Sequence, residues 1–61
     1  MRNIHAQVVQ DHLKAIVDSA AENEDWNTVR MAALAAWDMG LLTVNKMDGD
    51  VPIDVTWDLL R

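Results

Sequence analysis

The segment from Trp26 to Met39 constrains this fold most, because as a helix it would be apolar on nearly every side. At about 100° per residue, Trp26 and Trp37 share one face, and the opposite side still carries Met31 and Ala35. A helix of this kind is normally buried on more than one side. The remaining sequence is too short to cover both sides, so we expect a partner. The first face comprises Trp26, Val29, Ala33, Ala36, Trp37 and Leu41.

The length of 61 residues permits one small domain, residues 1–61. Such a chain buries only about 60% of the surface that its unfolded form exposes. Because it has no cysteine, disulfides and thiolate zinc sites are excluded, and oligomerisation or dense helix packing must replace them. We therefore predict a homodimer. The lack of cysteine, of a signal peptide and of a membrane-spanning run favours a cytoplasmic protein.

Periodicity predicts a mainly α fold built on an antiparallel helical hairpin. The first helix spans about 3–22, and the second spans about 25–39 after a polar break in which Asn23 or Asp25 can cap it. Gly40 suits the left-handed position after a helix end, with Leu41 folding back against Ala36. We expect Trp26 and Trp37 to supply the main volume of an alanine-lined core.

Residues 42–60 are ambiguous between strand and helix. Asp48-Gly49 is a turn signal, and the apolar residues from Val51 to Trp57 alternate with polar ones, which favours a β-hairpin with Pro52 at an edge. A short terminal helix capped by Asp54 is the alternative, as is a small hairpin followed by one helical turn.

No residue pattern indicates catalysis, a cofactor or a metal. His5 and His12 lie about 10.5 Å apart along one helix, so one chain does not easily use both for a single metal; we interpret them as structural, or as a pH-sensitive pair across a dimer interface. Asp48, Asp50 and Asp54 lack the spacing of a calcium loop. Ser19 has no histidine near it on its helix face. We predict that the chain is not an enzyme.

The charge pattern argues against nucleic acid as a direct partner. The net charge is −5, and the five basic residues are spread along the chain without forming a basic face. The same acidity permits an alternative function, in which carboxylates imitate phosphates and block a nucleic-acid-binding protein. The five basic residues are Arg2, Lys14, Arg30, Lys46 and Arg61.

Three short segments are similar to the end of a winged-helix domain: Gly40-Leu41-Leu42-Thr43-Val44, then Asp48-Gly49, then Val51 to Thr56. The resemblance covers under a third of the chain. It implies a helix ending at Gly-Leu-Leu, followed by a two-stranded wing. The preceding helix would be the recognition helix, and Arg30 is its only base. With two helices before the wing, the resemblance implies a reduced winged-helix regulator that contacts protein.

The leading functional hypothesis is a small acidic protein-binding regulator, an adaptor or inhibitor that occupies a partner's surface. In manner it is similar to the short acidic inhibitors of phages and mobile elements. We expect the interface with the partner, or with a second copy, where the second helix leaves apolar side chains uncovered. The predicted interface residues are Met31, Leu34, Ala35, Asp38 and Leu42.

Overall fold

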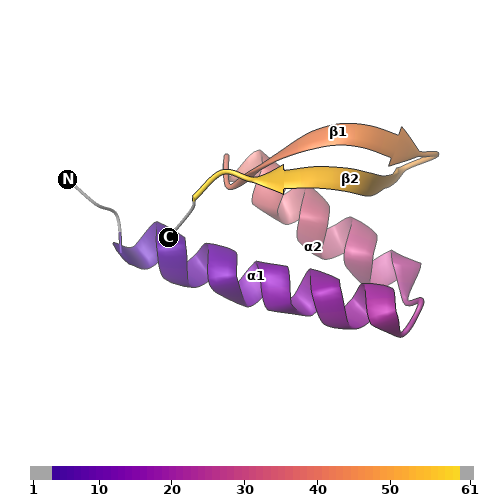
Figure 1. Cartoon of the computed structure of the whole chain (residues 1–61), viewed down its shortest axis with the longest axis horizontal. Coiled ribbons are helices and arrows are strands. Elements are labelled where there is room, and N and C mark those ends of the chain that lie inside the picture. The colour runs from indigo at the N-terminus through magenta and orange to yellow at the C-terminus, as the bar shows by residue number, and fades with distance from the viewer. Residues whose placement is uncertain (1–3, 60–61) are drawn as a thin grey trace.

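The computed structural model describes residues 4–59 as two helices followed by a two-stranded antiparallel sheet (Figure 1). The elements are α1 (Ile4–Glu22), α2 (Trp26–Asp38), β1 (Leu42–Asp48) and β2 (Val51–Trp57). This confirms the predicted helical hairpin, and it resolves the ambiguity of the last third in favour of strands. The predicted helix start at residue 3 and the predicted end of the last element at residue 60 lie outside the described residues.

The turn between the helices is fixed by backbone and side-chain caps. The Asp25 amide donates to the Ala20 carbonyl at 2.8 Å, which requires Glu24 to adopt the left-handed φ of 57°. Asp25 then caps α2, because its carboxylate accepts from the Thr28 amide at 3.3 Å and from the Thr28 hydroxyl at 2.6 Å. Asp25 was one of the two caps that the sequence predicted.

Gly40 ends α2 as predicted. Its φ is +76°, its amide donates to the Trp37 carbonyl at 3.0 Å, and the Leu41 amide donates to the Ala36 carbonyl at 2.8 Å. These two bonds form the Schellman arrangement, which satisfies carbonyls that the end of a helix would otherwise leave unpaired. The chain thereby turns back over α2 and enters β1.

The β-hairpin closes through a two-residue turn at Gly49 and residue 50. Gly49 has a φ of +63°, the conformation that a type II′ turn requires at its first central position. Leu42 pairs with Trp57 at the open end of the hairpin. The regular register is interrupted where Asn45 on β1 and Ile53 on β2 have no Cα partner, so each strand carries a bulge that breaks its pleat.

The core lies where the hairpin and α1 pack against α2. Its centre comprises Ala33, Ala36, Leu41 and Leu42, and partly buried side chains from α1, β1 and β2 surround it, Trp57 among them. The prediction for the other two tryptophans is wrong, because Trp26 and Trp37 are each 49% exposed. The small alanines at the centre of the helix face allow close packing, and the two indoles fall at its edge, about 70–90° away by helical geometry.

Gln10 attaches the chain's end to α1. Its side chain is only 3% exposed, although glutamine is a residue type that is mostly found exposed. The amide oxygen accepts from the Leu59 backbone N–H at 2.8 Å, and Nε2 donates to the Leu59 carbonyl. Gln7 adds a longer bond of 3.4 Å to the same carbonyl. One side-chain amide thus satisfies both backbone polar groups of Leu59, which lies 49 residues further along the chain.

Candidate functional site

Two mainly apolar surfaces stand out in the described part of the molecule. The first is the outer face of α2, defined by Met31, Leu34, Ala35 and Asp38. The second is the groove between α1 and β2, defined below. Both arise because α2 carries apolar side chains around most of its circumference while α1 and the hairpin cover only part of it.

The outer face of α2 follows the spacing of three and four residues that puts side chains on one helix surface. Met31 is 61% exposed, Leu34 and Ala35 are half-buried, and Asp38 is exposed. Arg30 lies at the edge of this face, where its Nη2 donates to the side-chain Oδ1 of Asn27 at 2.7 Å and its Nε is 3.7 Å from an Asp50 carboxylate oxygen.

Leu42 does not join this surface. The sequence grouped it with the outer face of α2, but the structure leaves it 2% exposed within the chain's own core. The reason is the turn at Gly40, which directs the chain back across α2, so that β1 begins with Leu42 packed inward beside Ala33 and Ala36. Of the five predicted interface residues, Met31 and Asp38 are therefore exposed, Leu34 and Ala35 are half-buried, and Leu42 is buried.

The groove between α1 and β2 has a volume of about 520 Å³. Its lining residues come from α1, α2 and β2, and Figure 1 shows β2 passing in front of α2 and above α1. Its floor is α2, and its walls are α1 and successive residues of β2. We call it the α1–β2 groove; it is lined by Lys14, Val17, Asp18, Ala21, Trp26, Val29, Ala33, Pro52, Ile53, Asp54, Val55 and Trp57.

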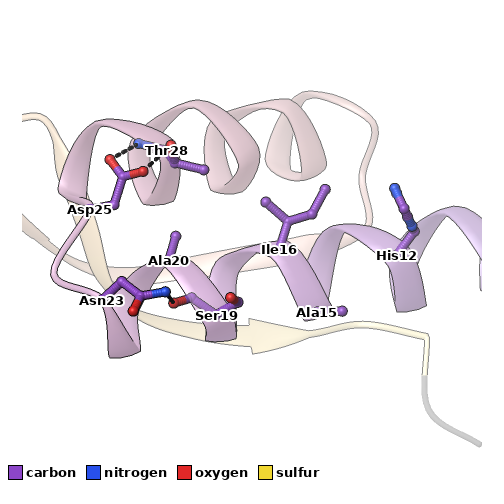
Figure 2. Close-up of a pocket in the computed structure, with 8 residues that line it drawn as sticks. All are labelled: His12, Ala15, Ile16, Ser19, Ala20, Asn23, Asp25 and Thr28. Atoms are coloured by element: carbon purple, nitrogen blue, oxygen red, sulfur yellow. Dashed lines mark hydrogen bonds between the residues drawn. The ribbon is translucent and has the colours of Figure 1, made fainter.

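A second, shallower hollow lies between α1 and the start of α2, with a volume of about 370 Å³ (Figure 2). It contains Ser19, His12 and Asp25, the residue types of a hydrolytic triad, but not in a triad's arrangement. Ser19 and His12 are seven residues apart on one helix, about 10.5 Å along its axis. Both carboxylate oxygens of Asp25 bond Thr28. Figure 2 shows His12 at the far end of the hollow from Asp25.

The two histidines are exposed on α1. Within residues 4–59, no group of three or more histidine or acidic side chains is arranged to hold a metal ion. Neither helix in this part of the chain is long and apolar enough to cross a membrane.

Charge is strongly one-sided in the described chain. All ten acidic residues lie within 4–59, but only three of the five basic ones do: Lys14, Arg30 and Lys46. Lys14 pairs with Asp18 at 3.0 Å, and Arg30 approaches Asp50. Two of these three cations are therefore within ion-pair distance of carboxylates of the same chain, and the third, Lys46, is the cross-strand register partner of Asp54.

Comparison with known proteins adds no assignment. No protein-family model matches the chain, and no curated protein or solved structure matches it either.

Proposed function

We propose that this protein is a small regulator, an adaptor or inhibitor, that works by binding another protein and not by catalysis. The observation that carries the proposal is the outer face of α2, where Met31 stands 61% exposed beside Leu34 and Ala35. Methionine is enriched where proteins meet. The cysteine-free sequence supports a cytoplasmic location for this activity.

The outer face of α2 also supports self-association as a homodimer. A two-fold axis makes a surface meet its own copy. In an antiparallel pair of α2 helices centred on Leu34, Arg30 of each copy lies level with Asp38 of the other, because each is four residues from Leu34. The apolar contact at the centre is then flanked by two pairs of opposite charge. These pairs favour this alignment of the two helices over alignments shifted along the helix axis.

Size-exclusion chromatography with light scattering tests the dimer. The wild type should have twice the 6.9 kDa mass of one chain at micromolar concentration, and Met31→Glu should be monomeric, because it places two carboxylates at an apolar contact. Val8→Glu is the matched control, since Val8 is 60% exposed on α1 and outside the face. A folded wild-type monomer would contradict the homodimer.

Affinity capture from the source cell, followed by mass spectrometry, tests the regulatory role itself. The wild type and Val8→Glu should retain the same partner protein at near-equal amounts. If the wild type retains no protein above the level of a bead control, the binding function is refuted, whatever the oligomeric state.

A further inference from the structure

The α1–β2 groove has the features of a second binding site, separate from the outer face of α2. Its floor and walls are mainly apolar, with Val29 and Ala33 buried below and Trp26 and Ile53 half-exposed at its rim. Its volume of about 520 Å³ falls within the range of about 300–1,000 Å³ that is typical of ligand sites. It is large enough for more than one side chain.

The edge of β2 decides which backbone conformation the groove accepts. The consecutive residues 52–55 line it, so the groove runs along the strand's edge and not along one face, since alternate residues point to opposite faces. β2 pairs only with β1, which leaves this edge without a strand neighbour. Pro52 has no N–H, however, and the bulge at Ile53 breaks the pleat. These features block addition of a regular third strand, so a helical ligand fits better than an extended one.

Charge decides the composition of the ligand. The charged residues that line the groove are Lys14, Asp18 and Asp54, and Lys14 is already paired with Asp18 at 3.0 Å. Around them, the described chain holds ten carboxylates against three cations. A ligand with lysine or arginine beside its apolar side chains complements this rim, and an acidic ligand is repelled.

We propose that the α1–β2 groove binds a basic amphipathic helix of a partner protein, with apolar residues at spacings of three and four in the groove and basic residues at its acidic rim. This inference rests on the proposed protein-binding function and names the chemistry of its partner. The apolar anchors enter between Trp26 and Ile53, and the basic residues lie along Asp18 and Asp54.

A fluorescent peptide tests this assignment by polarisation. The probe is a 16-residue peptide of leucine and lysine, with leucines at helical spacing, and it is compared with a scrambled peptide of equal composition and a version with glutamate for lysine. We expect the first to bind, the scrambled peptide to bind at least tenfold more weakly, and the glutamate peptide not to bind.

Two protein variants locate the binding. Ile53→Lys places a cation at the rim and should weaken binding at least tenfold. Val8→Lys makes the same change of charge at a similarly exposed valine on the far side of α1, and it should weaken binding by no more than about twofold, as expected for a screened surface charge. Circular dichroism checks that both variants are folded.

Equal weakening by Ile53→Lys and Val8→Lys, or equal affinity for the scrambled peptide, would overturn the assignment of binding to the groove. Binding would then be due to the overall negative charge of the protein. Absence of binding to the helical peptide would also overturn this assignment. Either result leaves the regulatory proposal intact if affinity capture retains a partner protein, so the two failures are distinguishable.

Discussion

Replacing Gln10 by leucine measures the contact that holds the chain's end on α1. The substitution keeps the approximate size of a side chain that is 3% exposed, but it removes the acceptor of the Leu59 N–H and one donor to the Leu59 carbonyl. The Leu59 carbonyl still accepts from Gln7 at 3.4 Å. The Leu59 N–H, in contrast, loses the Gln10 oxygen that accepts its hydrogen bond. A buried group left without its partner costs about 1–3 kcal/mol, and we expect a loss near 2 kcal/mol.

Thermal unfolding followed by circular dichroism gives the test. For a domain of this size, 1 kcal/mol changes Tm by about 4–8 °C, so Gln10→Leu should lower Tm by about 8–16 °C. Hydrogen exchange of the Leu59 amide should become faster in the same variant, because its acceptor is gone. Gln7→Leu, which removes the longer bond to Leu59 and a side-chain bond to Asp11 but keeps both Gln10 bonds, should lower Tm by less.

Gln10→Glu separates the hydrogen bonds from packing. A protonated carboxyl group can accept from the Leu59 N–H and donate to its carbonyl as the amide does, whereas the ionised form cannot donate and is buried with a charge. The folded-state pKa of the introduced carboxyl is thus raised above its unfolded value of about 4.3. Stability is retained below that value and is lost as pH rises through the folded pKa.

The free energy of unfolding of Gln10→Glu should therefore approach that of the wild type at pH 4 and fall behind it toward pH 7, while the deficit of Gln10→Leu stays constant. Two results would refute the role assigned to this amide. One is a Gln10→Leu variant as stable as the wild type, and the other is a Gln10→Glu variant whose loss of unfolding free energy is the same at pH 4 and pH 7.

Three further substitutions have expected outcomes in urea unfolding. Glu24→Gly should stabilise the protein by about 0.5–1 kcal/mol, because glycine adopts the φ of 57° without strain; unchanged or lower stability would contradict this. Asp25→Ala should destabilise by about 1 kcal/mol through loss of the α2 cap, and stability equal to that of the wild type would contradict the cap. Leu42→Ala should cost about 3 kcal/mol, as a leucine that is 2% exposed predicts, and a midpoint equal to the wild type's would show that Leu42 is not in the core.

Local signals in the sequence were sufficient for the two helices and for the turns that follow them. Asp25, Gly40 and Gly49 each occupy the position that their backbone or capping preferences predict, because these preferences act over a few residues. The C-terminal strands were ambiguous since the same residues fit a helix capped by Asp54. Pairing of Leu42 with Trp57 decides between them, and that pairing depends on residues fifteen positions apart.

The sequence-based predictions that were wrong concern which side chains on a helix are covered by the neighbouring elements. A helical wheel groups Trp26 and Trp37 with Ala33, but it does not specify how closely the hairpin approaches, and the close approach leaves both indoles half-exposed. Gln10 looked like a surface residue because its partner, Leu59, is 49 residues away. The α1–β2 groove was not predicted for the same reason: its walls come from α1 and β2, and no sequence window contains both.

The alanine-rich centre connects stability with binding. Among the described residues, the buried hydrophobic set holds four alanines, Ala20, Ala32, Ala33 and Ala36, whose side chains remove little apolar area from water. Larger side chains such as Trp26, Met31 and Ile53 stay about half-exposed or more, so much of the chain's potential hydrophobic stabilisation is unrealised in one isolated copy. A ligand that covers these side chains binds only the folded state, and it therefore raises the free energy of unfolding in proportion to the logarithm of its concentration above Kd. For a chain of this size, folding and recognition then depend on the same side chains.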